Sequence, residues 1–360
     1  MALSRKTKNW IIILAVLVVG VVALMIWRSG SRGATFKQDF HVEDIDAVSK
    51  IYMVDKNNHE VLLTRSITES GDTMWVVDGE YEASEPMVDM LLDVVHTMRI
   101  RSAVNKNAVP NVIKDLAGSS VKVEVYKTEP LINWFGGSLR LFTREHLATT
   151  YFVGRETQDQ MASYMFREGD KVPYVIHIPH FRGYLTPTFS TSPYTWRSHR
   201  IVALDVKQIE RVELSILAAP EESFAVYRDG ETFSMELTSQ HEALPYFDTA
   251  RVAQMLISMR NLNFDEYAAV VPNSNMDTSF REGPRNVLRI TDTAGNVSEV
   301  KTYIKYTNPD DAKLMDNPEN FSEFDIDRLY AIVNNRDTVL LQYYVFDNIL
   351  QPASFFIGKQ

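Results

Sequence analysis

The chain has 360 residues, of which 45% are hydrophobic, and it carries a formal net charge of −10. That hydrophobic content supports a substantial folded core and excludes a disordered tether, while the absence of cysteine excludes disulfides and thiol chemistry. An acidic surface repels nucleic acid and anionic lipid headgroups, so a function in binding either of them is not expected.

The first element in chain order is an uncharged apolar segment, Trp10–Trp27. As a helix it would be about 27 Å long, close to the thickness of a bilayer core. Its terminal residues, Trp10 and Trp27, are of the type that favours the membrane–water interface. We therefore expect residues 10–27 to form a transmembrane signal anchor.

Basic residues before the anchor set its expected orientation. Arg5, Lys6 and Lys8 precede it, and the positive-inside tendency places residues 1–9 in the cytoplasm. Residues 28–360 are then expected to be periplasmic, on an inner-membrane protein. The alternative is a cleaved signal peptide, for which Ser29 and Ser31 are small residues near a cleavage point.

After a linker over residues 28–40, alternating apolar and polar residues predict half-buried strands. These strands are Val121–Tyr126, Val212–Ile216 and Leu288–Asp292. Two continuous apolar runs, Tyr174–Ile178 and Val339–Phe346, predict strands that are buried on both faces or covered by a helix.

A helical pattern occurs twice, 161 residues apart. Each copy places four apolar residues at i, i+3, i+4 and i+7, which is one face of a helix. The two sets are Leu91, Val94, Val95 and Met98, and Val252, Met255, Leu256 and Met259. The same shift relates an opening strand in each half, Val48, Ile51 and Met53 to Ile209, Val212 and Leu214. We therefore predict an α+β fold with two related modules, 41–186 and 206–360, joined by a connection over 187–205. Each module is expected to be mainly antiparallel sheet with one or two helices.

Side chains with metal or catalytic potential are present but not in a diagnostic arrangement. His177 and His180 lie three residues apart in a predicted strand, where they would point to opposite faces. The acidic stretch 308–327 lacks the spacing and the turn glycine of a calcium loop. We therefore predict no catalytic residue, no metal site and no cofactor.

The segment from His180 to Arg200, which runs from the end of the first module into the connection, is the most unusual stretch outside the anchor, because it mixes aromatic residues and arginines without periodicity. Such residues can hold an anionic or sugar ligand or anchor a protein interface. Alternatively, the aromatic residues pack the two halves together and the arginines cap carbonyl groups. The candidate interaction surface consists of His180, Arg182, Tyr184, Trp196, Arg197 and Arg200.

Four consecutive segments carry a family resemblance. They are Val112–Ser120, Tyr151–Thr157, Tyr164–Asp170, and Pro173–Leu185 followed by Trp196-Arg197. Their succession resembles domain of unknown function 4340, and the last segment resembles the version found in Bacteroidota envelope proteins with one N-terminal membrane helix. The resemblance covers about residues 45–205, with Ala117-Gly118 in place of the usual Gly-Leu. It implies no activity and no catalytic residues, and it suggests an association with ABC-type transporters of the gliding-motility type.

Three functions are compatible with these observations. The first is a non-enzymatic, membrane-anchored extracytoplasmic subunit or scaffold of a cell-envelope assembly, accessory to an ABC-type transporter and bound to envelope or inner-membrane proteins. The second is a ligand-binding module for a glycan, peptide or lipid in a cleft between the modules. The third is an envelope hydrolase of unfamiliar type.

Overall fold

The computed structural model describes residues 40–68, 71–134, 139–271, 276–308 and 321–357. These residues form two compact units. The first unit contains the described residues up to Thr73 together with Pro86–Ser192, and the second contains Met74–Glu85 together with the chain from Pro193 onward. The predicted anchor, with Arg5, Lys6, Lys8, Trp10 and Trp27, lies outside the described residues. Within the part of the chain that is described, no helix is long and apolar enough to cross a membrane.

The first sheet has nine strands in the order β4-β3-β2-β1-β6-β7-β8-β9-β5. Its strands are β1 (Val48–Val54), β2 (Glu60–Ile67), β3 (Thr73–Val77), β4 (Tyr81–Glu82), β5 (Arg99–Ala103), β6 (Val121–Trp134), β7 (Leu139–Glu156), β8 (Ser163–Arg167) and β9 (Tyr174–His177). The central pairings are antiparallel, and Ile51 of β1 lies opposite Leu63 on one side and Val125 on the other.

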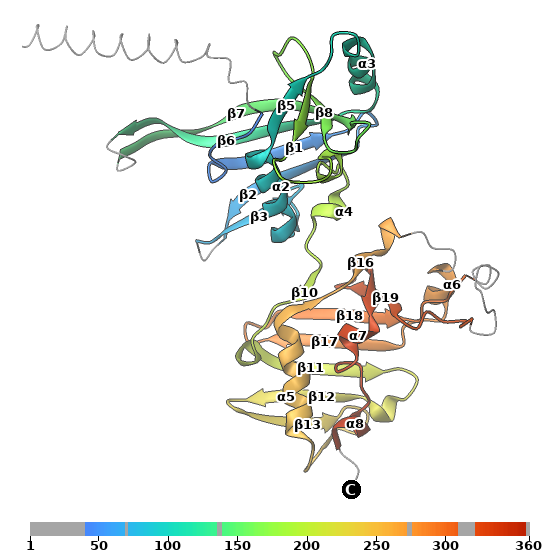
Figure 1. The fold of residues 1–360 in the computed structure, drawn as a ribbon. Coiled ribbons are helices and arrows are strands. Elements are labelled where there is room, and N and C mark those ends of the chain that lie inside the picture. Colours follow the sequence, from blue (N-terminus) through green and yellow to red (C-terminus); the bar gives the residue numbers. More distant parts are fainter. Residues whose placement is uncertain (1–39, 69–70, 135–138, 272–275, 309–320, 358–360) are drawn as a thin grey trace, which may run out of the picture. The chain divides into compact units, whose positions relative to one another are not determined.

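Two helices accompany this sheet, α2 (Glu85–Thr97) and α3 (Val109–Ser119) (Figure 1). Helix α2 buries Leu91 and Val95, and the sheet buries alternate residues such as Ile51 and Met53. Helix α3 instead packs Leu116 against Phe152, Phe166 and other residues of β7, β8 and β9 that alternate with the core positions. The sheet is therefore covered in part on both faces.

The second sheet also has nine strands, in the order β14-β13-β12-β11-β17-β18-β19-β20-β16. Its strands are β11 (Ile209–Ile216), β12 (Phe224–Asp229), β13 (Thr232–Leu237), β14 (Glu242–Ala243), β16 (Glu266–Tyr267), β17 (Asn286–Asp292), β18 (Val297–Tyr303), β19 (Arg328–Val333) and β20 (Asp337–Gln342). A separate pair, β10 (Arg200–Val202) and β15 (Leu262–Asn263), precedes and follows its main helix.

That main helix is α5 (Thr249–Ile257), which continues as a 3₁₀ turn over Ser258–Asn261. Its apolar face forms one cluster with Val212, Leu214 and Ile290 of the sheet. Three shorter helices follow, α6 (Met276–Arg281), α7 (Tyr343–Phe346) and α8 (Ala353–Ile357). The second unit thus has more helices than the one or two predicted for a module.

The two sheets have the same strand order, position by position. All eight apolar residues of the repeated helical pattern are buried, and so are the six residues of the two predicted opening strands. Burial on one face requires an apolar residue at each of these positions, which is why the pattern is visible in the sequence at a fixed shift. The α+β class and the mainly antiparallel sheets are as predicted.

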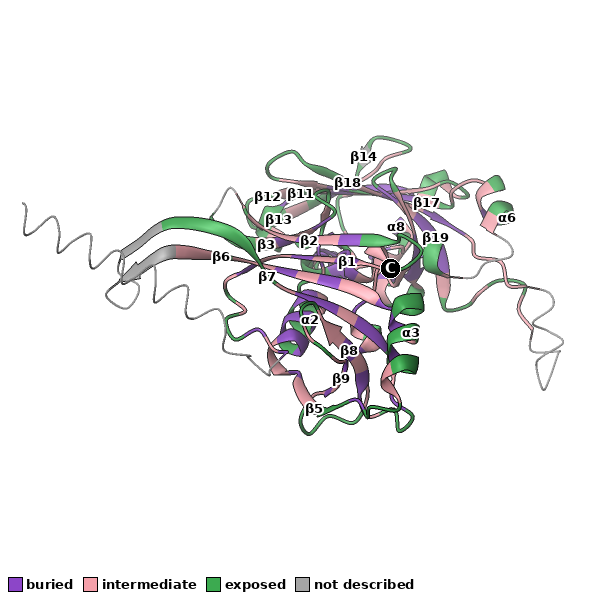
Figure 2. Ribbon diagram, turned by 90° about the horizontal axis from the view of Figure 1, so that it is seen from above, coloured by how far each residue is buried: buried purple, intermediate pink, exposed green. Residues whose placement is uncertain are grey.

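The hairpin β6–β7 is where the two sheets differ most. Strands β6 and β7 have 14 and 18 residues, whereas the corresponding β17 and β18 have seven each. Among the described residues, β6 pairs beyond Lys127 with no strand other than β7, and β8 pairs only with Tyr151–Glu156 of β7. The outer part of the hairpin therefore extends beyond the rest of its sheet, with an exposed β7 (Figure 2).

Two predicted strands were wrong in detail. The run Val339–Phe346 was expected to be one strand, but β20 ends at Gln342 and α7 begins at Tyr343, whose amide still donates to the carbonyl of Asp327 in the β19–β20 register. The run Tyr174–Ile178 was expected to be buried on both faces, but only Ile176 is buried, since β9 lies next to the edge strand β5.

Candidate functional site

The predicted interaction residues of the first unit lie in one loop after β9. His180 and Arg182 are exposed and Tyr184 is half-buried. The end of this loop is fixed to β8, because the Ser163 hydroxyl accepts hydrogen bonds from the amides of Leu185 and Thr186 at 2.9 and 3.2 Å. His180, Arg182 and Tyr184 are thus presented on a loop with a fixed base.

The predicted residues of the second unit are in a different environment. Trp196 is fully buried and Arg197 is only 5% exposed, so these two side chains do not contribute to a surface as expected. Arg200 is exposed and pairs with Glu82 at 2.7 Å. The backbone of this segment is also held in place, because the Trp196 carbonyl accepts a hydrogen bond from the Ser84 amide at 2.6 Å within the same unit.

Arg197 is the centre of an aromatic cage. Its guanidinium lies 3.6 Å from the ring centre of Tyr81, 4.4 Å from that of Tyr267 and 5.5 Å from that of Tyr194. Its Nη2 donates to Asp337 at 2.6 Å, which makes an ion pair, whereas the buried Nε has no hydrogen-bond partner. A guanidinium held between aromatic faces and a carboxylate is well compensated when desolvated.

Tyr267 completes this cage through its hydroxyl. The hydroxyl donates to the carbonyl of Ser198 at 3.0 Å, and burial raises the pKa of Tyr267 to about 12. The cage therefore joins the segments around Tyr81, Arg197, Tyr267 and Asp337. Arg197 therefore links segments of the second unit. This role agrees better with the alternative in which the residues of this segment serve packing than with a contact to a ligand.

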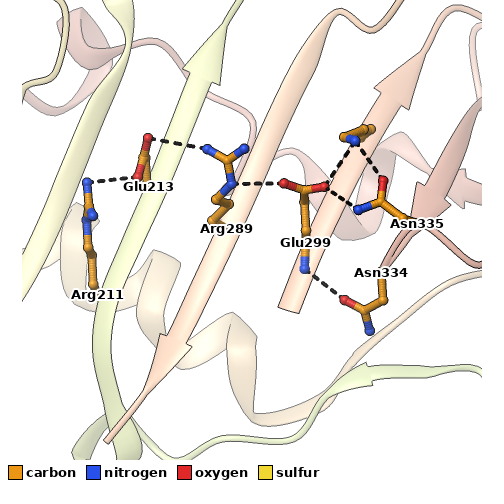
Figure 3. A network of polar contacts seen from close by, with 7 residues as sticks. Arg211, Glu213, Arg289, Glu299, Asn334 and Asn335 are labelled. Atoms are coloured by element: carbon orange, nitrogen blue, oxygen red, sulfur yellow. Dashed lines mark hydrogen bonds and ion pairs between the residues drawn. The ribbon is translucent and has the colours of Figure 1, made fainter. Parts of the chain in front are cut away.

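The outer face of the second sheet carries a network of alternating charges that crosses β11, β17 and β18 (Figure 3). Its ion pairs and hydrogen bonds link Arg211, Glu213, Arg289, Glu299, Lys301, Asn334 and Asn335. Burial opposes ionisation of Glu299, but hydrogen bonds from Lys301 and Arg289 lower the pKa of that carboxyl. Because the opposite charges are paired with one another, this face of the sheet can remain exposed to water.

The described part of the second unit contains a groove with a volume of about 520 Å³, which we call the β18–α7 groove. It is formed by the ends of β11, β17 and β18, by α7, and by the chain before β19. Its lining consists of Ile216, Ala218, Arg285, Asn286, Thr302, Tyr303, Ile304, Phe324, Leu329, Tyr343, Phe346, Asp347 and Leu350. A second hollow of about 390 Å³ shares Ala218, Arg285 and Ile304 with it.

Large apolar side chains are exposed beside this groove. Tyr344 is 91% exposed and follows the lining residue Tyr343, and Ile326 is 75% exposed and follows Phe324 by two residues. The two segments are adjacent in space, because the Tyr343 amide donates to the carbonyl of Asp327 at 2.9 Å. The groove therefore continues into an exposed apolar rim.

The groove lining contains two charged residues, Arg285 and Asp347. Among the described residues the Arg285 guanidinium has no ion-pair partner, although it lines both hollows. Burial raises the pKa of Tyr343 in the same groove, so this phenol stays neutral at physiological pH. Asn286 is engaged internally, donating to the Thr302 hydroxyl at 3.1 Å. An apolar groove with one available guanidinium is suited to binding apolar groups next to a carboxylate.

The sequence did not indicate this groove. Arg285, Phe324 and Tyr343 are far apart in the chain and belong to no recognisable motif. A useful signal was the pair Tyr343-Tyr344 at the end of an apolar run, because two adjacent residues in a strand cannot both face the core.

Comparisons with known proteins gave one result. No curated protein and no solved structure matches the chain. A family model described as domain of unknown function matches residues 75–282, which is more than half of the chain and includes parts of both sheets. The matched range begins later than the range of about 45–205 covered by the resemblance, and it extends further along the chain, into the second sheet. The chain therefore belongs to the family described as domain of unknown function (DUF4340).

Proposed function

We propose that this chain is a membrane-anchored, extracytoplasmic and non-enzymatic subunit of a cell-envelope assembly, and that its second unit docks a protein partner in the β18–α7 groove. The anchor is residues 10–27, with residues 1–9 in the cytoplasm and residues 28–360 in the periplasm. The resemblance to Bacteroidota envelope proteins suggests an inner-membrane partner such as an ABC-type transporter.

The observation that carries the docking proposal is the exposed rim of the groove. Tyr344 and Ile326 leave large apolar surfaces in water beside an open apolar hollow. A contiguous apolar patch of this kind is typical of an interaction site, and tyrosine and arginine are the residue types most enriched at energetically important interface positions.

Arg285 adds a requirement on the partner. Its guanidinium has no carboxylate partner among the described residues, and it stands at the wall between the two hollows. We therefore expect the bound segment to place an aspartate, a glutamate or a chain terminus at this point, next to apolar side chains.

The test is affinity purification of the tagged full-length protein from mildly crosslinked and gently solubilised membranes, followed by mass spectrometry. We expect a stoichiometric membrane partner with the unchanged protein. The partner should be lost with Tyr344→Ala and with Arg285→Glu, because these changes remove an apolar contact and reverse the charge at the groove.

The matched control is Tyr246→Ala. Tyr246 is 83% exposed in the same unit but does not line the groove. The proposal predicts that this variant keeps the partner. A partner that is retained equally by all three variants, or a protein that purifies alone, contradicts it.

A second function, a ligand-binding module, is supported by the size of the same groove. A volume of about 520 Å³ lies within the range of small-molecule sites, roughly 300–1,000 Å³. Under this function the ligand is an apolar molecule with a carboxylate. Native mass spectrometry of the purified protein would show a bound small molecule that is absent from Arg285→Glu.

A further inference from the structure

The second sheet has an open edge where the chain of β18 runs past the start of β17. Strand β17 begins at Asn286, but the chain of β18 continues beyond Tyr303 and pairs with the segment before β19, where Tyr306 lies opposite Phe324. We call residues 304–307 the β18 extension. It has a partner strand on one side, and its other side faces the place that β17 would occupy if it were longer.

Backbone hydrogen bonds show which residues of the β18 extension face each side. The carbonyl of Lys305 accepts the Asp325 amide at 2.8 Å, and the Thr307 amide donates to the same facing segment at 3.0 Å. Successive residues of an antiparallel strand direct their backbone groups to opposite edges, so those of Ile304 and Tyr306 point to the other side. Among the described residues, no hydrogen bond reaches the amide or the carbonyl of Ile304 or Tyr306.

The sequence before β17 explains why this side is open. Gly283 follows α6, its φ angle of 84° lies in the left-handed region, and its amide donates to the carbonyl of Phe280 at 3.1 Å. Pro284 comes next and has no amide hydrogen to donate. The carbonyl of Arg285 accepts the Leu217 amide, in the chain after β11, at 2.9 Å. The chain before β17 is therefore turned away from the β18 extension.

The open edge forms part of the wall of the smaller hollow, which has a volume of about 390 Å³. Ile304 lines this hollow together with Leu217 and Arg285. Leu217 is 48% exposed, and Arg285 is exposed as well. Glu282, the acidic residue of this lining, already accepts the Tyr306 hydroxyl at 2.6 Å. The hollow thus combines an apolar wall, open strand backbone and a guanidinium without an ion-pair partner among the described residues.

Open strand backbone is a template for pairing with another extended chain. Ile304 and Tyr306 lie roughly 7 Å apart along the strand, and each offers one donor and one acceptor. A β-strand presents its own donors and acceptors at the same spacing, because every second residue faces the same edge. Recognition by strand addition takes its affinity from these backbone bonds and its specificity from pockets for alternate side chains.

We propose that the partner of the β18–α7 groove supplies an extended segment that adds as a β-strand to Ile304 and Tyr306, in the place that β17 leaves open. One apolar side chain of this segment enters the hollow beside Leu217, and a carboxylate of the segment reaches Arg285. The inference rests on the proposed docking of a protein partner, and it adds the form in which that partner binds.

The first experiment identifies the bound segment. A photo-activatable crosslinking amino acid replaces Leu217 in the tagged full-length protein, and the peptide that it captures in membranes is identified by mass spectrometry. We expect one segment of a different protein, with alternating apolar residues and an aspartate, a glutamate or a chain terminus beside them. A crosslink to a second copy of this chain assigns the edge to self-association and overturns the proposal.

The second experiment uses a synthetic peptide with the sequence of the captured segment. A single N-methyl group is moved along its backbone, and binding to the full-length protein is measured by fluorescence anisotropy. Each N-methyl group removes one amide donor, and only alternate amides of an added strand face the open edge. We expect affinity to fall at least about tenfold at every second position, with a much smaller effect at the positions between.

A pair of substitutions at Ile304 tests the same edge on the protein. Ile304→Pro removes the amide donor and places a ring on the edge, without breaking a hydrogen bond of the described residues. The matched control, Ile304→Val, keeps the backbone unchanged. We expect the peptide to bind at least about tenfold more weakly to the proline variant and almost normally to the valine variant. Hydrogen exchange of the Asp325 amide shows whether the β18 extension is still paired in each variant.

The outcomes separate this inference from the proposed docking. Binding that is weakened by Arg285→Glu and Tyr344→Ala, but shows no alternation in the N-methyl series and no loss with Ile304→Pro, refutes strand addition and leaves the docking proposal standing. A partner that is retained without any crosslink from position 217 has the same meaning. A full-length protein that captures no partner refutes both.

Discussion

Removal of the Arg197 guanidinium tests whether the aromatic cage holds the second unit together. Arg197 is 5% exposed and is compensated by Asp337 at 2.6 Å and by the rings of Tyr81 and Tyr267. Breaking a buried ion pair by removing one partner typically costs about 3–5 kcal/mol, because the other charge is left uncompensated. We expect Arg197→Ala to lower the local opening free energy by at least about 3 kcal/mol.

The assay is hydrogen exchange of the full-length protein, followed over Trp196–Val202. In the regime where exchange reports the opening equilibrium, a loss of about 3 kcal/mol raises the exchange rate roughly 100-fold or more. The matched control is Arg200→Ala. Arg200 also pairs with a carboxylate, but both partners of this pair are exposed, so its loss is worth about 0–1 kcal/mol. Equal effects of the two substitutions would refute the assignment of stability to the cage.

Three further predictions concern local features of the two units. Asp248 accepts hydrogen bonds from the first amides of α5, and Asp248→Ala should destabilise the second unit by about 1 kcal/mol in urea unfolding. A hydrogen bond to Glu124, followed by burial, raises the pKa of Tyr126 to about 12. The stability from this bond is therefore present below the ordinary pKa of 10 and lost as pH rises through 12, and the alkaline absorbance step near pH 12 should be smaller in Tyr126→Phe. A Cβ added at Gly154 would lie 2.6 Å from Leu116 Cδ2, so Gly154→Ala should cost about 1–3 kcal/mol, and an unchanged urea midpoint would contradict this packing.

Local patterns predicted the regular elements because burial on one face imposes a periodicity on the sequence. Leu91 and Val95 of α2, and Met255 and Met259 of the second helical segment, are buried as their spacing indicated. The same reasoning failed for Val339–Phe346. A continuous apolar run does not show where a chain leaves the sheet, and here β20 ends at Gln342 and α7 begins at Tyr343.

The candidate site was the least predictable part. Arg197 and Trp196 were assigned to a surface because arginine and tryptophan in an irregular segment are typical of interfaces. Their burial depends on partners that no local pattern contains. Asp337, for example, lies 140 positions from Arg197 in the sequence.

The sequence by itself determined the family, the α+β class and the apolar faces that build the two sheets, since these depend on residue type and spacing along the chain. Only the tertiary structure decided that Arg197 is enclosed by tyrosines, that Arg285 stands in an apolar groove, and that the β6–β7 hairpin extends beyond the strands beside it. These features depend on whether segments that are far apart in the sequence pack against each other. Their energies come from desolvation and packing between elements, which periodicity within one element does not encode.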